Sequence, residues 1–142
     1  MNKLIATHSG SFHADDVFGV AVLATVFPDH AIVRTRDAEE IARADFAVDV
    51  GGLWDPATGR FAHHQRGFDG TRTRADGEPG GGPAEKYASA GLVWREYGGA
   101  CVERLANSLG HPVPPEVAAR IAADADASLV RYLDLVDNGA AD

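Results

Sequence analysis

The sequence predicts a single α/β domain with a mostly parallel sheet flanked by helices, and three observations support this fold class. Short apolar runs typical of buried strands, such as Leu4–Thr7 and Phe46–Val50, alternate with helical patterns. Strands that alternate with helices imply parallel neighbours, because parallel strands need crossover connections. The 142 residues, with 45% hydrophobic content, are about one domain and are enough to bury a sizeable core.

The first half of the chain is expected to contain three strands joined by two helices. These elements follow in the order strand Leu4–Thr7, helix Phe18–Phe27, strand Ala31–Arg36, helix Asp37–Arg43 and strand Phe46–Val50. Pro28 ends the first helix, and Asp37 with Glu40 three residues later resembles a capping box for the second. Open parallel sheets bind ligands at the carboxyl ends of their strands, where His8 and Asp49 are expected to lie.

The second half is expected to contain a hairpin, a long loop and three helices. The elements follow in the order strand Leu53–Asp55, strand Arg60–His63, loop Arg66–Pro83, and helices Ser89–Tyr97, Ala100–Leu109 and Pro115–Val136. Pro56–Gly59 is a good turn sequence between the two strands. The loop is rich in Gly, Arg and Asp, which predicts a mobile surface segment, and it is the only locally basic stretch. In the last helix an apolar face includes Ile121, Leu129 and Val136.

Composition restricts the classes of function. The formal charge of −8, from 21 acids and 13 bases, means that the general surface repels polyanions, so any contact with nucleic acid must be local. The single cysteine, Cys101, excludes an intramolecular disulfide and a multi-cysteine zinc site, and we expect it to be a small buried residue. The sequence shows neither a signal-peptide core nor an apolar run long enough for a membrane span, which predicts a cytoplasmic protein.

Four groups of polar side chains favour a divalent metal ion. The candidate ligands and their neighbours are histidines and carboxylates from separate parts of the chain, namely His8, His13, Asp15, Asp49, His63, His64 and Asp137. The first three lie in a predicted loop that Gly10 holds open, whereas Asp49 lies in an apolar strand, where an unpaired carboxylate is costly. Imidazole and carboxylate groups in this ratio suit a borderline cation such as manganese, and a bridging carboxylate could hold two ions.

Each group also has a structural explanation when it is considered alone. Asp15 or Asp16 could cap the following helix, and Asp49 could accept a buried hydrogen bond from a neighbouring loop. The two adjacent histidines could lie on the surface, and on a strand they point to opposite sides, which predicts different roles for them. Asp137 could belong to a solvated acidic helix end, although the helix dipole there favours a cation partner. Together the four groups favour the metal site.

Six short motifs run in a fixed order through nearly the whole chain. They are Thr7–Asp16, Val33–Asp37, Val48–Gly52, His63–Arg66, Ser89–Leu92 and Val136–Gly139. Their order and spacing resemble the melanocyte-proliferating-gene (MYG-type) family, a branch of the DHH phosphoesterases. The resemblance implies a DHH-type α/β domain, a two-metal centre and the hydrolysis of phosphate esters. The eukaryotic members of the family look like 3′-to-5′ RNA exonucleases.

The resemblance also implies roles for individual residues. It suggests that His8 and His13 bind one ion, that Asp15, His63 and Asp137 bind the other, and that Asp49 bridges both. It implies two manganese ions, with Mg²⁺, Co²⁺ or Zn²⁺ as alternatives. His64 and Arg66 are then expected to stabilise the phosphoryl oxygens while a water activated by the two metals attacks phosphorus.

The chain departs from the family pattern in two respects. Family members carry an aspartate immediately before the histidine pair, whereas this chain has Ala62, and the lost carboxylate is expected to weaken metal binding or activity. The family's chains continue into a second domain that closes over the site, so residues 1–142 are expected to form only the catalytic domain.

The sequence is compatible with three functions. The leading expectation is a metal-dependent exonuclease that acts on RNA or short oligonucleotides. The second is a phosphatase or pyrophosphatase for small phosphate esters. The third is a metal-binding module without catalytic activity.

Overall fold

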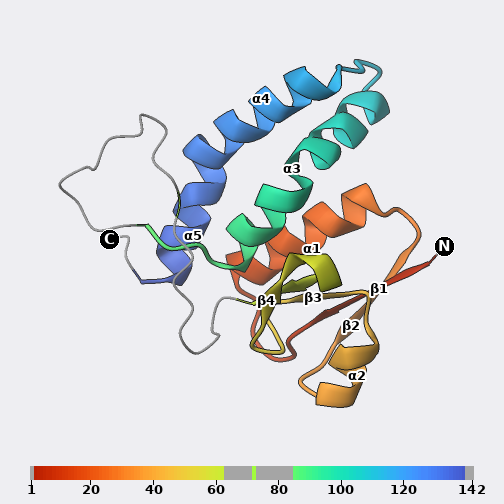
Figure 1. Ribbon diagram of the computed structural model, residues 1–142, viewed down its shortest axis with the longest axis vertical. Helices are drawn as coiled ribbons and strands as arrows, with labels where there is room; N and C mark the ends of the chain where they lie inside the picture. Colours follow the sequence, from red (N-terminus) through yellow and green to blue (C-terminus); the bar gives the residue numbers. More distant parts are fainter. Residues whose placement is uncertain (1, 63–71, 73–84, 140–142) are drawn as a thin grey trace.

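A five-stranded sheet forms the centre of the molecule and carries helices on both faces (Figure 1). The computed structural model describes residues 2–62, 72 and 85–139. The strands lie in the order β2-β1-β3-β5-β4, with bounds β1 Lys3–Thr7, β2 His30–Arg34, β3 Phe46–Val48, β4 Trp54–Asp55 and β5 Arg60–Phe61. All neighbouring strands are parallel except β4, which is antiparallel to β5. The predicted α/β class with a mostly parallel sheet is therefore confirmed.

The helices form two unequal layers. Their bounds are α1 Ala14–Val26, α2 Ala38–Arg43, the 3-10 turn η1 Pro56–Thr58, α3 Ser89–Ser108, α4 Pro115–Ala125, the π-helical turn η2 Asp126–Val130 and α5 Arg131–Asp137. Helices α1 and α3 cover one face of the sheet, α4 lies alongside α3, and the short α2 covers the opposite face (Figure 1). Within the described part of the chain, none of these helices combines the length and apolar character that a membrane span requires.

Both faces of the central strands β1 and β3 are largely buried, as their apolar sequences predict, whereas the edge strand β2 is more exposed. Successive side chains of a strand point to opposite faces. Ile5 and Phe46 accordingly join the large cluster formed with α1 and α3, whereas Ala6 and Ala47 join a small cluster with Ile41 of α2. Because β2, β1, β3 and β5 run parallel, their carboxyl ends lie at one edge of the sheet, between the two helical layers.

Helix α1 begins earlier than the sequence predicted. It starts at Ala14 rather than at Phe18, so Asp15 and Asp16 lie in its first turn and not in an open loop. The Asp16 carboxylate accepts a hydrogen bond of 2.7 Å from the His13 backbone N–H, which stabilises this early start. Asp37 caps α2 as predicted, because its side chain accepts a hydrogen bond from the Glu39 backbone N–H, and the bond involves Glu39 rather than the predicted partner Glu40.

Helix α3 is continuous, although the sequence predicted two helices with a break near Gly98. Glycine weakens a helix but does not forbid it, and here tertiary packing decides the outcome. Gly98 is buried and leaves room for the indole of Trp94, since a Cβ on Gly98 would lie 2.8 Å from that ring. The buried position of Cys101 in the same helix confirms the prediction, and burial raises the pKa of its thiol.

The carboxyl-terminal helical region differs from its predicted packing. The predicted single helix is divided by the π-helical turn η2, and the predicted apolar face is only partly covered: Ile121, Leu129 and Val136 are exposed, whereas Ala125 and Leu133 pack against the core. Ala118 and Val130, which lie outside the predicted face, are buried. The extra residue in a π-helical turn rotates the following side chains about the axis, so a regular helical period fails beyond it.

Candidate metal centre

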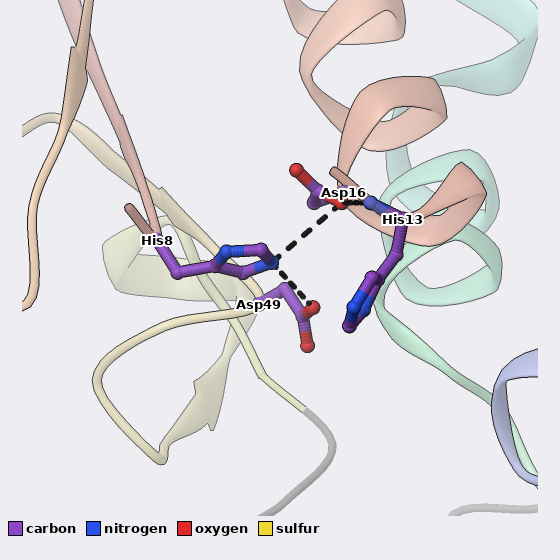
Figure 2. Close-up of side chains that lie close together, drawn as sticks. All are labelled: His8, His13, Asp16 and Asp49. Carbon is purple, nitrogen blue, oxygen red and sulfur yellow. Dashed lines mark hydrogen bonds and ion pairs between the residues drawn. The ribbon is translucent and has the colours of Figure 1, made fainter. Parts of the chain in front are cut away.

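Four side chains from three segments converge at the carboxyl edge of the sheet (Figure 2). They are His8, His13, Asp16 and Asp49, and one ligand atom from each lies within 4.8 Å of the corresponding atoms of the other three. His8 follows β1 directly, His13 and Asp16 come from the start of α1, and Asp49 follows β3 directly. Residues separated by 41 positions in the sequence thus meet because β1 and β3 are parallel neighbours.

The backbone around Asp49 holds its carboxylate toward the site. Asp49 has φ +57°, which makes it the only non-glycine residue with positive φ in the described part of the chain. Its N–H still donates a hydrogen bond of 2.9 Å to the carbonyl of Phe61 in β5. Strand β3 therefore ends two residues earlier than predicted, because the left-handed conformation turns the chain out of the ladder. Such uncommon backbone geometry often marks a functional position.

His8 lies between two carboxylates. Its Nε2 is 3.3 Å from an Asp49 oxygen and 3.6 Å from an Asp16 oxygen, and all three side chains are at most 5% exposed (Figure 2). The His8 Nδ1 is 3.3 Å from the Ser9 carbonyl, so a proton on Nδ1 leaves the lone pair of Nε2 directed at the carboxylates. A buried group of this kind needs positive charge at its centre.

The donor set fits a divalent cation of the borderline class. Two imidazoles and two carboxylates suit manganese, zinc or cobalt. Ligand atoms at about 2.1 Å from an ion lie at most about 4.2 Å apart, so the observed separations need only small side-chain rotations to close around one ion. His13 is exposed and its ring centroid lies 5.4 Å from that of His8, which leaves an open side for a substrate.

Comparison with known proteins identifies the family of this chain. A family model of the MYG1 exonucleases, described as an uncharacterised protein family (UPF0160), matches residues 4–142. The chain belongs to this family. No solved structure matches it significantly.

Relatives in the MYG1 family occur in several animals. The chain is 37% identical over 141 residues to a MYG1 protein of Caenorhabditis elegans, a match that covers 98% of this chain and 40% of the relative. It is 38% identical to the human MYG1 exonuclease over 137 residues and 40% identical to the mouse MYG1 exonuclease over 138 residues. Each of these two matches covers 95% of this chain and 35% of the relative, so the chain spans well under half of the proteins that it matches.

Asp15, the aspartate predicted as a ligand, has a different neighbour in this MYG1-family chain. Its Oδ1 accepts a hydrogen bond of 2.6 Å from the backbone N–H of Ala90, in the first turn of α3. The N-cap residue of α3, Ala88, provides no side-chain cap, so the Asp15 carboxylate satisfies a helix N–H from another element. The neighbouring Asp16 contributes a ligand atom to the cluster of four, and the metal-binding role of Asp15 stays a prediction.

The remaining predicted residues fall into two groups. Asp137 is the last residue of α5, as predicted, but it is not one of the four residues that converge. The predicted metal ligand His63 and the predicted substrate contacts His64 and Arg66 lie outside the described residues. The structure thus brings together three predicted ligands, His8, His13 and Asp49.

Sequence reasoning missed Asp16 as a potential ligand. The signal lay in the helix start: with His13 as the N-cap, Asp15 and Asp16 occupy successive positions about 100° apart around the helix axis, so they point to different neighbours. Placing α1 four residues later hid this distinction.

A second buried carboxylate, Asp134, supports the same region from α5. Its Oδ1 accepts a hydrogen bond of 2.9 Å from the Gly91 N–H, and its Oδ2 pairs with the guanidinium of Arg72, which also pairs with Asp126. Burial raises the pKa of Asp134 to about 6, although the Arg72 charge works in the opposite direction. Carboxylates from α1 and α5 therefore meet at the amino-terminal turn of α3, directly behind the candidate site.

Proposed function

We propose that this protein is a metal-dependent phosphodiester hydrolase that acts as an exonuclease on RNA or short oligonucleotides in the 3′-to-5′ direction. The observation that carries the proposal is the convergence of His8, His13, Asp16 and Asp49 at the carboxyl edge of the sheet. Membership of the MYG1 family supports it, because the human and mouse relatives carry the name exonuclease.

The residues of the cluster would each have a distinct task. His8 and Asp49 provide buried ligand atoms on the rigid strand ends, and His13 provides a ligand on the exposed side. Asp16 adds a second carboxylate while it caps α1 through the His13 N–H. A divalent ion held there supplies Lewis acidity and a nucleophile from water near neutral pH.

A second ion beside the first is a further prediction. Asp49 is the proposed bridge, and His63 and Asp137 are proposed to complete the second site as the family resemblance implies. His64 and Arg66 are proposed to bind the phosphoryl oxygens, and manganese is the preferred metal. Divalent ions would also provide the positive charge that attracts phosphate to a chain whose formal charge is −8.

Release of mononucleotides from end-labelled RNA tests the activity. We expect manganese to support release from the 3′ end and EDTA to abolish it. Intact RNA at every metal and protein concentration would refute the exonuclease. Free phosphate from pyrophosphate or nucleotides, with RNA intact, would assign a phosphatase instead, and bound metal without turnover of any ester would leave only a metal-binding module.

Elemental analysis of protein purified without chelator tests the metal site. We expect about two equivalents in the unmodified protein and a fall toward zero in Asp49→Ala, because the proposed bridge contacts both ions. Retention of the full metal content by this variant would exclude Asp49 as a bridge.

A matched pair of variants tests which neighbouring aspartate binds metal. Asp15→Asn and Asp16→Asn both retain an oxygen that can accept the observed backbone hydrogen bond, so both should fold. We expect Asp16→Asn to weaken manganese binding, measured by calorimetric titration of metal-free protein, by about tenfold or more. A larger loss of manganese affinity in Asp15→Asn than in Asp16→Asn would assign the ligand role to Asp15.

A further inference from the structure

A pocket of about 540 Å³ lies directly beside Asp49, on the side of the sheet that carries α2. It is lined by α2, by residues 49–53 after β3, and by the end of the loop before α2 and part of β5. Asp49 belongs both to this lining and to the candidate metal cluster, so the pocket opens next to the proposed reaction centre. The volume is in the range of about 300–1,000 Å³ typical of small-molecule sites.

Two arginines bring positive charge to the pocket. Arg36 donates one hydrogen bond of 3.0 Å to the Ser9 carbonyl, and Arg60 donates one of 3.2 Å to the Ala42 carbonyl. Each guanidinium carries five N–H donors, so these anchoring bonds leave most of the donors available. The Nη1 of Arg60 is buried and has no hydrogen-bond partner among the described residues. Because Nη1 is buried, the rest of the Arg60 guanidinium would contact a ligand, and together with Arg36 it favours an anion in the pocket.

The other walls are apolar or made of backbone. Ile41 and Leu53 present apolar surface, and Leu53 remains 45% exposed although it borders the pocket. Gly51 and Gly52, both with positive φ, form the turn that follows Asp49 and have no side chain to fill the space. Ala62, where the resemblance implies an aspartate, adds a further apolar contact and no negative charge. The pocket thus combines cationic donors with surface suited to a flat, weakly polar ring.

We infer that this pocket is a substrate subsite that holds the nucleoside phosphate unit next to the scissile phosphate. The phosphate of that unit binds Arg36 and Arg60, and its base and sugar lie against Ile41 and Leu53. Planar guanidinium groups bind phosphate through paired hydrogen bonds, which fixes the register of the substrate relative to Asp49. The inference rests on the proposed function, because it assigns the neighbour of the cleaved bond.

Direct binding provides the first test and needs no catalysis. Adenosine monophosphate is titrated calorimetrically into the full chain in EDTA. We expect Arg60→Met and Ala42→Trp each to weaken binding about tenfold or more, the first by removing the charge and the second by filling the pocket from an exposed position of α2. Arg43→Met is the matched control, since Arg43 is an exposed arginine of α2 outside the pocket lining, and it should bind like the unmodified protein.

Kinetics provide the second test. With manganese present, the KM for a diribonucleotide is compared with the KM for bis(p-nitrophenyl) phosphate, which has no nucleoside. We expect the ratio of the two constants to rise about tenfold in Arg60→Met and in Ala42→Trp, and not in Arg43→Met. Thermal unfolding of each variant confirms that it is folded, and Ala42→Trp preserves the test if the loss of Arg60 impairs folding.

The outcomes separate this inference from the proposed function. Nucleotide binding that both pocket variants lose, in a protein that cleaves no diester, supports the pocket as a nucleotide site but refutes the hydrolase and with it the place of the pocket beside a scissile phosphate. Diester cleavage with an unchanged KM ratio in both variants supports the hydrolase and overturns the subsite. Failure of the unmodified protein to bind adenosine monophosphate also overturns the subsite. Loss of free-nucleotide binding in the variants with an unchanged KM for the diribonucleotide overturns it as well, because the pocket would then bind only free nucleotide.

Discussion

Asp49 shows how one residue can combine a conformational and a chemical requirement. Its positive φ is unfavourable for most side chains but acceptable for aspartate and asparagine, whose short polar side chains tolerate this region. Its carboxylate faces His8 and also lies 3.4 Å from the Ser89 hydroxyl. The position therefore selects a small group of residues by backbone geometry, and the charge of the site selects aspartate within that group.

The variant Asp49→Asn separates these two requirements. In EDTA we expect a melting temperature at or above that of the unmodified protein, because the backbone conformation is retained and a buried charge is removed. Manganese at 100 times its dissociation constant should stabilise the unmodified protein by about 2.7 kcal/mol and leave the variant unchanged. Differential scanning fluorimetry with and without manganese measures both effects. An equal metal-dependent shift in the two proteins would show that the Asp49 charge is not needed for binding.

Helix α3 shows how packing between elements overrides local preference. Gly98 and Gly99 are adjacent in the same helix but have different surroundings: Gly98 lies against Trp94, and a Cβ on Gly99 would meet nothing within 4 Å. The indole of Trp94 is held in place by a hydrogen bond of 2.8 Å from Nε1 to the Ala122 carbonyl of α4. The glycine at position 98 is thus part of the contact between α3 and α4.

Alanine substitutions at these two glycines should have opposite effects. Gly98→Ala should lower the free energy of unfolding by roughly 1–3 kcal/mol, because the new methyl group collides with a ring that cannot easily move. Gly99→Ala should raise it by about 1 kcal/mol, because it improves helix propensity without a clash. Urea denaturation followed by circular dichroism measures both values. A stabilising Gly98→Ala would mean that the Trp94 ring adjusts freely.

Arg72, Asp126 and Asp134 join distant parts of the whole chain. Arg72 precedes α3 in the sequence, whereas its two carboxylate partners belong to η2 and α5, and its guanidinium also lies 4.7 Å from the centre of the Tyr87 ring. The space is tightly filled, since a Cβ on Gly91 would overlap the Asp134 carboxylate. This buried ion-pair network holds α5 against the start of α3.

The ion-pair network predicts that Arg72→Met lowers the free energy of unfolding by an amount that depends on pH. The folded pKa of Asp134, about 6, lies above the ordinary value of 3.8, so its protonation favours the folded state. That contribution is complete below about pH 4 and is lost as the pH rises through 6. Without Arg72 the pKa of Asp134 rises further. The free energy of unfolding of the variant should therefore fall by roughly 3 kcal/mol at pH 8, and at pH 5 the fall should be smaller by about 1 kcal/mol or more.

The control for this experiment is Arg131→Met. Arg131 forms a solvent-accessible pair with Glu85, so its removal should change the free energy of unfolding much less than Arg72→Met does and by a similar amount at pH 5 and pH 8. Urea denaturation at the two pH values compares the variants. An equal loss for Arg72→Met at both values would contradict the raised pKa of Asp134.

Structural features that depend on a few adjacent residues could be predicted from the sequence, whereas features that depend on distant residues could not. The Asp37 cap, the strand ends that carry His8 and Asp49, and the Pro56–Gly59 turn each depend on a few adjacent residues. The ligand atom of Asp16 depends on one turn of helix, and the burial of Asp134 depends on Arg72, which is 62 positions away. His8 and Asp49 could be placed together because the ends of neighbouring parallel strands lie at one edge of the sheet, whereas the contribution of Asp16 depends on the exact start of α1.

Strand β1 has one further consequence for the behaviour of the protein. It is hydrogen-bonded to β2 on one side and to β3 on the other, and its residues Ile5 and Ala6 are fully buried. Amide protons in such a strand exchange with deuterated solvent only when the molecule opens globally. His8 follows this strand directly, whereas His13 adjoins a helix end that can fray. Isotope exchange should therefore be slow in the strand that leads into His8 and faster at the helix start beside His13, which would make the exposed side of the centre its more adjustable part.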